Sequence, residues 1–147
     1  MKKIILFLLF FVSLLPASLF AQTYAKGDKV EVLWHGAWYK SRIERVEKEG
    51  YYRVHFMGYW ASREEIVPSE RIRNIIPRTQ PDLNSLKMGS PVEFLEGDHW
   101  RPATFVELDG KKAVIRYTDG EAQKEQKILT NLLSIVPSSS PTSRPNP

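Results

Sequence analysis

The sequence has no cysteine, only three histidines and no recognisable catalytic motif. Without cysteine the chain forms no disulfide, no catalytic thiolate and no cysteine-based metal site. His35, His55 and His99 lack the spacing that metal ligands show on a single element, so no metal site is predicted. Neither a nucleophile elbow nor a glycine-rich phosphate loop is present. We therefore expect a protein without catalytic residues, cofactor or enzymatic activity.

A long apolar run occurs at the N-terminus, where it follows two lysines and ends at Ala21. This order of charge, apolar run and small residue is typical of a secretory signal peptide cleaved after Ala21. The alternative is an uncleaved membrane anchor, but Pro16 leaves only about 12 uninterrupted apolar positions where about 20 are needed. We predict that residues 1–21 are removed, that the product is periplasmic or extracellular, and that it is not stably inserted in a membrane.

The chain also lacks a strong excess of either charge. Loss of Lys2 and Lys3 reduces the 21 basic side chains to 19, against 17 acidic ones, which leaves a net charge of +2. Proteins that bind nucleic acid usually carry a concentrated basic face. The near balance of charge, together with export, argues against a nucleic-acid partner.

Short alternating segments occupy the first part of the exported chain. Lys29 to Trp34 alternates, with Val30 and Val32 on one face, as in a half-buried strand. Four more strands are expected at Trp38 to Val46, Tyr51 to Met57, Ser62 to Val67 and Arg71 to Ile76, with turns at Gly58 and at Pro68 to Glu70. Five short strands in about 50 residues predict a small, strongly bent barrel.

The same pattern then begins again, after a polar segment that contains two prolines. Gly89 to Leu95 matches Gly27 to Leu33, and Trp100 to Leu108 matches Trp38 to Val46. Ala113 to Tyr117 matches Tyr52 to Phe56 if one residue is dropped from the preceding turn, and Leu132 to Val136 matches Ile72 to Ile76 to within a residue. A spacing near 61 residues therefore indicates an internal repeat.

The repeat divides the exported chain into two units of one fold class. We predict an all-β protein of two tandem five-stranded SH3-like barrels, with copy one at residues 24–77, a linker at 78–87 and copy two at 88–137. Residues 138–147 are polar and rich in proline, which predicts a disordered tail.

Aromatic residues are concentrated between Trp34 and Glu65. This stretch holds three of the four tryptophans and four of the six tyrosines. A small β-domain needs one or two large aromatics for its core, so the surplus is expected at the surface. Exposed aromatics near the carboxylates of Glu64 and Glu65 suggest a binding site.

Copy one resembles the Tudor domain of the Tudor, Agenet, chromo and MBT group. The resemblance rests on Gly27-Asp28-Lys29-Val30, Trp34, Trp38-Tyr39, Val54-His55-Phe56, Gly58-Tyr59 and Arg63-Glu64-Glu65, in this order. It covers about 50 residues of copy one and, more weakly, the matching part of copy two. It implies a five-stranded SH3-like barrel in each copy.

Members of that group bind methylated lysine or arginine in an aromatic cage. A poorly hydrated cation is attracted to the negative faces of aromatic rings, each worth roughly 0.5–2 kcal/mol. By position, the resemblance implies a pocket formed by Trp34, Tyr39, Phe56 and Tyr59. Possible extensions of this pocket are Trp38 and Trp60 as walls and Glu64 and Glu65 as counter-charges.

Copy two differs at most of these positions. Trp34 corresponds to Glu96, Tyr39 to Arg101 and Tyr59 to Gly120, whereas Trp100 and Tyr117 keep aromatic side chains. Copy two is therefore expected to be mainly structural, or to bind something different.

Three kinds of function fit these observations. The first is a binding module that recognises a cationic or peptidic group through the pocket of copy one. The second is a cell-envelope module whose aromatic rings stack on glycan. The third is a structural or protein-interaction tandem in which low exposure of Trp34, Tyr39 and Tyr59 would place the aromatics between the two copies. The partner is thus a protein, a peptide or an envelope component, and the oligomeric state stays open.

Overall fold

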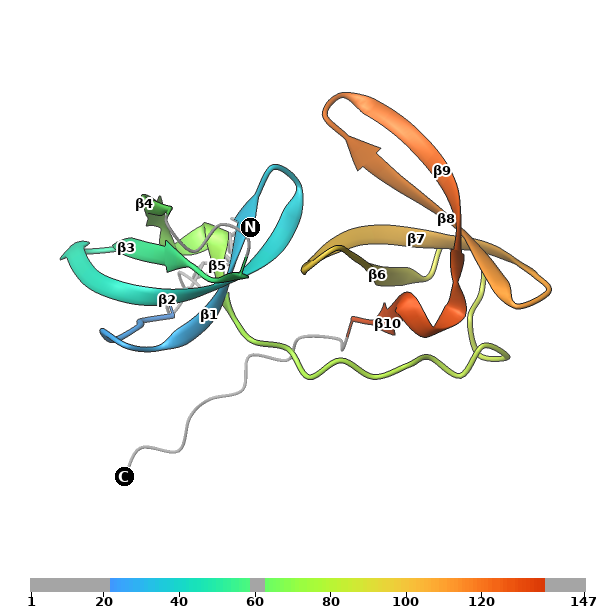
Figure 1. Cartoon of the computed structure of the whole chain (residues 1–147), viewed down its shortest axis with the longest axis horizontal. Coiled ribbons are helices and arrows are strands. Elements are labelled where there is room, and N and C mark those ends of the chain that lie inside the picture. Colours follow the sequence, from blue (N-terminus) through green and yellow to red (C-terminus); the bar gives the residue numbers. More distant parts are fainter. Residues whose placement is uncertain (1–21, 59–62, 137–147) are drawn as a thin grey trace, which may run out of the picture.

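The computed structural model describes residues 22–58 and 63–136. The expected signal peptide and tail lie outside these residues, as do Tyr59 and Trp60. The regular elements of the described chain are β-strands and short 3-10 turns, and the chain forms two lobes joined by the linker (Figure 1). No helix in the described ranges is both long enough and apolar enough to span a membrane.

The described residues of copy one include five antiparallel strands and the 3-10 turn η2. They are β1 (Lys29–Trp34), β2 (Ala37–Lys48), β3 (Tyr51–Phe56), β4 (Glu64–Pro68), η2 (Ser69–Arg71) and β5 (Ile72–Asn74). The strands pair in the order β5-β1-β2-β3-β4, and the long β2 pairs with β1 through its first half and with β3 through its second. The chain thus bends around β2, as expected from short strands separated by tight turns.

Copy two has the same order of elements and the same pairing. It comprises β6 (Pro91–Glu96), β7 (His99–Asp109), β8 (Lys112–Asp119), β9 (Ala122–Leu129), η3 (Thr130–Leu132) and β10 (Leu133–Ile135). The strands pair as β10-β6-β7-β8-β9. The prediction of an all-β fold with two five-stranded units is therefore confirmed.

The two units differ from the predicted barrels in one respect, because their sheets do not close. Within the described residues β4 does not pair with β5, and β9 does not pair with β10. The last strand of each copy is only three residues long and pairs on one side alone, with β1 or β6. Such short strands leave too little edge for a second ladder.

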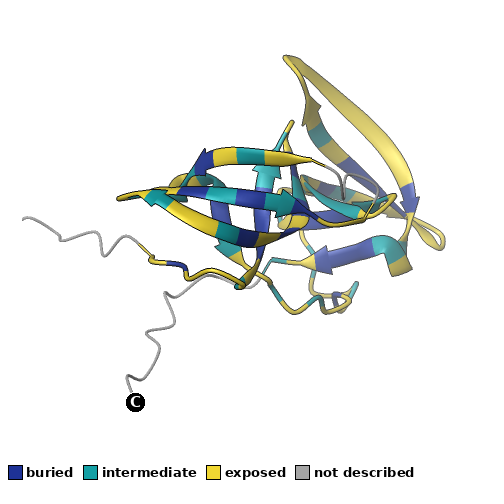
Figure 2. Cartoon of the chain, turned by 60° about the vertical axis from the view of Figure 1, so that its left-hand side comes forward, coloured by how far each residue is buried: buried dark blue, intermediate teal, exposed yellow. Residues whose placement is uncertain are grey.

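Strand β9 had no signal in the sequence. Seven of its eight side chains are exposed and only Ile128 is buried, so the strand shows no apolar alternation (Figure 2). It is held instead by eight paired positions along β8, from Lys112 opposite Leu129 to Asp119 opposite Ala122. Backbone pairing and cross-strand ion pairs, rather than burial, define this strand.

β-Bulges explain why one residue had to be dropped to align the copies. Both copies have a bulge at the same place, between Ile43 and Arg45 in β2 and between Phe105 and Glu107 in β7. Copy one has a second register shift, between Val46 and Lys48. A bulge adds one residue to one strand of a pair, so the second bulge accounts for the offset.

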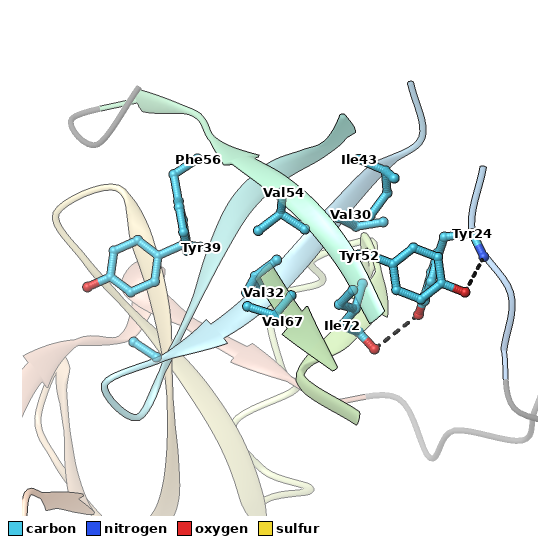
Figure 3. Packing of buried hydrophobic residues seen from close by; sticks show 11 residues of the cluster. Tyr24, Val30, Val32, Tyr39, Ile43, Tyr52, Val54, Phe56, Val67 and Ile72 are labelled. Atoms are coloured by element: carbon cyan, nitrogen blue, oxygen red, sulfur yellow. Dashed lines mark hydrogen bonds between the residues drawn. The ribbon is translucent and has the colours of Figure 1, made fainter. Parts of the chain in front are cut away.

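Each copy has its own hydrophobic core. The core of copy one is formed by Tyr24, Val30, Val32, Ala37, Tyr39, Ile43, Tyr52, Val54, Phe56, Val67 and Ile72. Figure 3 shows Tyr39 and Phe56 at one end of this core and Tyr24 and Tyr52 at the other. The core of copy two is formed by Val92, Phe94, Phe105, Ala113, Ile115, Ile128 and Leu133.

Among the described residues, one backbone pair joins the strands of copy one to those of copy two. Trp38 in β2 lies opposite Trp100 in β7, and the two strands are antiparallel. The two tryptophans occupy equivalent positions of the repeat, so the copies are related by an approximate local two-fold axis at this pair.

Two glutamates and two arginines form a network of ion pairs at the contact between the copies. Glu31 and Glu93, at equivalent positions of β1 and β6, are only 1% and 3% exposed. Arg73 Nε lies 2.8 Å from Glu31 Oε2, and its Nη1 lies 2.7 Å from Glu93 Oε1. Arg78 Nη2 lies 2.7 Å from Glu31 Oε1 and 3.0 Å from Glu93 Oε2. Each arginine thus bridges both glutamates, and all four carboxylate oxygens are paired.

The two arginines also stack on the paired tryptophans. The guanidinium carbon of Arg73 lies 3.9 Å from the ring centroid of Trp38, and that of Arg78 lies 4.8 Å from Trp100. Arg73 comes from β5, but its equivalent in β10 is Ser134, as the pairing with Glu31 and Glu93 shows. The linker residue Arg78 therefore takes the place of the arginine that copy two lacks.

Candidate ligand-binding site

Three strand ends bring together three of the four aromatics implied by the resemblance. Trp34 ends β1, Tyr39 lies near the start of β2 and Phe56 ends β3. A two-residue turn, His35-Gly36, connects β1 to β2, and both residues have positive φ, 47° and 75°. Such a turn matches the twist of two antiparallel strands and keeps Trp34 and Tyr39 adjacent.

The three rings form a compact cluster, which we call the ring cluster. Trp34 lies 5.5 Å from Tyr39 and 6.1 Å from Phe56 between ring centroids, and Tyr39 lies 6.2 Å from Phe56. The interplanar angles, 57° to 81°, are those of tilted and edge-to-face pairs. Phe56 is fully buried and Tyr39 is 7% exposed, whereas Trp34 is partly exposed. Trp34 is therefore the ring that offers surface to a ligand.

Copy two covers one face of the ring cluster. His99, the first residue of β7, stacks on Tyr39 with centroids 4.5 Å apart and an interplanar angle of 22°. Its Nδ1 lies 3.2 Å from Asp98 Oδ1 and its Nε2 lies 3.3 Å from Glu96 Oε2. Burial raises the pKa of the Tyr39 hydroxyl, opposed by Arg101 and reinforced by Asp98 and Glu96. Tyr39 therefore stays neutral, and its surroundings hold two carboxylates from copy two.

A cationic side chain of the protein itself, that of Arg63, lies over the ring of Trp34. The guanidinium carbon of Arg63 lies 4.6 Å from the centroid of the Trp34 ring. Arg63 Nη2 also lies 3.9 Å from Glu65 Oε2, which is too far for a hydrogen bond. The other oxygen, Glu65 Oε1, accepts a hydrogen bond of 2.8 Å from Arg71, whose Nε donates to the Leu33 carbonyl. Glu65 is thus fixed at the ring cluster.

The remaining predicted residues lie elsewhere or outside the described ranges. Tyr59 and Trp60 are not described, so the structure does not place them. Trp38 lies on the other face of β2 from Tyr39, in the contact between the copies. Glu64 faces Arg53 at 3.8 Å and His55 at 3.7 Å rather than the ring cluster.

A shallow groove lies beside the ring cluster. It has a volume of about 530 Å³ and is lined by His35, Gly36, Pro102, Thr118, Asp119 and Gly120. It thus lies between the β1–β2 turn of copy one and the β8–β9 turn of copy two. The ring of His35 lies 4.0 Å from that of Trp34, so one lining residue of the groove contacts the ring cluster.

Sequence reasoning missed the contributions of His99, Arg63 and the arginine–glutamate network. The network had one available signal, because Glu31 and Glu93 recur at the same place in the repeat. The contact of His99 with Tyr39 had none, since its equivalent in copy one is Ala37.

The comparisons with known proteins concern the fold. Residues 27–77 match the Agenet domain family. The crystal structure of ADCP1 tandem Agenet domains 3-4 superimposes with a TM-score of 0.60 at 17% identity, covering 77% of this chain and 80% of that one. The AGD34 structure of Arabidopsis thaliana AGDP1 gives a TM-score of 0.60 at 15% identity, covering 77% of this chain and 82% of that one. No curated protein sequence matches the chain.

These matches establish the class of the fold. The chain has an Agenet-like fold in tandem, and its first copy matches the Agenet family in sequence as well.

Proposed function

We propose that this protein is an exported, non-enzymatic binding module that recognises a cationic side chain of a protein or peptide ligand. The observation that carries this proposal is the partly exposed Trp34, backed by the rings of Tyr39 and Phe56. The carboxylate of Glu65 lies at the same end of copy one, and those of Glu96 and Asp98 lie around Tyr39. Aromatic faces with nearby carboxylates attract a desolvated cation.

A fluorescence titration tests the site. Peptides with methylated lysine, methylated arginine or unmodified side chains are added to the full chain while tryptophan emission is followed. We expect a cationic peptide to change the emission of the wild type, and Trp34→Leu to abolish both the change and the binding. Tyr51→Leu is the matched control, because Tyr51 is an exposed aromatic of copy one outside the ring cluster. Equal binding by wild type and Trp34→Leu would overturn the proposal.

A second function is favoured by one observation. Tyr39 is 7% exposed and is stacked against His99 of copy two, as expected if the aromatics join the copies rather than bind a ligand. In that case the protein is an interaction tandem without a small cationic site. This function predicts that Trp34→Leu still binds the native partner, whereas a variant in which the contact between the copies is broken does not.

Export belongs to this proposal and is supported by the layout of residues 1–21. Mass spectrometry of the mature protein is expected to find Gln22 as its first residue. Recovery of the protein with residues 1–21 intact would contradict export by signal cleavage.

A further inference from the structure

Both copies place a guanidinium at the same end of the sheet, but they hold it differently. In copy two, Nε and Nη2 of Arg101 lie 2.9 and 2.8 Å from Glu96 Oε2. Its guanidinium carbon is 5.6 Å from the Tyr117 ring, and its side chain is only 13% exposed. Arg101 is therefore locked in place by two charge-assisted hydrogen bonds.

In copy one the guanidinium is loosely held. Arg63 lies 4.6 Å from the centroid of Trp34, which is within the range of a cation–π contact. Its distance to Glu65 Oε2 is 3.9 Å, and its side chain is 43% exposed. An exposed ion pair of this length contributes little to holding a long side chain in one position.

The carboxylate of Glu65, beside Arg63, has one oxygen with a hydrogen-bond donor and one without a donor among the described residues. Glu65 Oε2 is buried and accepts no hydrogen bond from any described residue, while Oε1 is held by Arg71. A buried carboxylate oxygen without a donor is unfavourable. A cation that replaces Arg63 would therefore gain the aromatic face of Trp34, and the departure of Arg63 would leave this oxygen as a possible partner.

We propose that Arg63 is a specificity-determining residue that occupies the cation position of Trp34 and competes with the ligand for it. This inference rests on the proposed cation site. Only a ligand that displaces Arg63 binds, so a small cation with no further contacts binds weakly. A peptide that also occupies the neighbouring groove overcomes the competition. In copy two the locked Arg101 closes the equivalent site to external cations.

The test compares binding of tetramethylammonium chloride by the full-length wild type, Arg63→Gln and Arg42→Gln at constant ionic strength. Arg42 is the matched control, because it is an exposed arginine of copy one that pairs with Glu44. Loss of one exposed cation–π competitor is expected to tighten binding about threefold to fivefold in Arg63→Gln. Arg42→Gln is expected to bind as the wild type does. Trp34→Leu identifies the signal that belongs to this site.

Three outcomes separate the inference from the proposed function. Tighter binding by Arg63→Gln alone supports the competition. Equal or weaker binding by Arg63→Gln, with a signal still lost in Trp34→Leu, overturns the competition and leaves the cation site standing. No response from any of the variants overturns the cation site and the competition together.

A second measurement needs no ligand. In the free protein, the ring current of Trp34 should shift the Nε–H resonance of Arg63, and the shift should vanish in Trp34→Leu. If the resonance is the same in both proteins, Arg63 does not occupy the ring face and the inference fails.

Discussion

The equivalent ends of the two copies carry opposite chemistry on the same backbone. In copy one, Trp34 and Tyr39 form an edge-to-face aromatic pair, and in copy two their equivalents Glu96 and Arg101 form an ion pair. The pairing of β1 with β2 and of β6 with β7 is the same in both. The fold therefore does not require aromatic side chains at these two positions, which makes the partly exposed Trp34 a better candidate for binding than the fully buried Phe56.

The two copies can carry different side chains at this end because their strand pairing is the same and one network of ion pairs joins them. The largest expected effect comes from breaking the arginine–glutamate network, where Glu31→Gln leaves two partly buried arginines with one buried carboxylate. Removing one partner of a buried ion pair typically costs several kcal/mol, so we expect the free energy of unfolding to fall by about 3 kcal/mol. Urea denaturation followed by tryptophan fluorescence measures this, since Trp38 and Trp100 lie in the contact.

The control for this change is Glu49→Gln, an exposed carboxylate in the turn after β2. It is expected to alter stability by less than about 0.5 kcal/mol. A loss of similar size in both variants would show that the network does not hold the copies together.

The copies also differ at the opposite end, where a tyrosine closes only the first core. Tyr24 stands three residues before Gly27, and Leu86 stands three residues before Gly89. Tyr24 donates a hydrogen bond of 3.0 Å to the Ile72 carbonyl and meets Tyr52 edge to face at 5.4 Å. Burial, with smaller contributions from Tyr52 and Asp28, raises the pKa of Tyr24 from 10.0 to about 12.

This difference predicts that copy one is sensitive to alkaline pH. A phenol with a raised pKa stabilises the folded state fully below pH 10, and that stabilisation is lost as the pH rises towards 12. We expect a loss on the order of 2 kcal/mol across this window, measured by urea denaturation at several pH values. Tyr24→Phe should reduce the pH dependence, at the cost of about 1 kcal/mol at neutral pH for the lost hydrogen bond. An unchanged pH profile in Tyr24→Phe would contradict this assignment.

The smallest expected effect concerns the two guanidinium groups. Arg101→Gln breaks two short hydrogen bonds in copy two and is expected to lower the free energy of unfolding by about 1 kcal/mol. Arg63→Gln removes a longer, more exposed contact and is expected to cost less than about 0.5 kcal/mol. Thermal unfolding of the two variants side by side measures the difference. If Arg63→Gln costs as much as Arg101→Gln, the two groups are held equally and copy one is not the looser site.

Most of the fold followed from local patterns. The strand Lys29–Trp34 has the bounds expected from its alternation, and the other strands of copy one lie within the expected segments or within a few residues of them. Strand β9 could not be expected, because an exposed strand held by its backbone needs no apolar period. The alternation of Lys29–Trp34 implies that Glu31 lies on the face opposite Val30 and Val32, but it could not show that copy two buries that face.

The candidate site was predictable only in part. The resemblance indicated Trp34, Tyr39 and Phe56, and tight turns at strand ends bring these residues together. His99 reaches the ring cluster from copy two, and no spacing in the sequence relates it to Tyr39. Arg63 belongs to the motifs that carry the resemblance, but they did not show that its side chain lies over Trp34.

The sequence by itself thus determined the all-β class, the repeat and the residues that differ between its copies, because apolar alternation and turn residues act over a few positions. Only the tertiary structure decided how the copies meet. A buried network of two glutamates and two arginines, one of them from the linker, sets that contact. The contact in turn places His99 on Tyr39, because the end of one sheet is completed by side chains that the other sheet supplies.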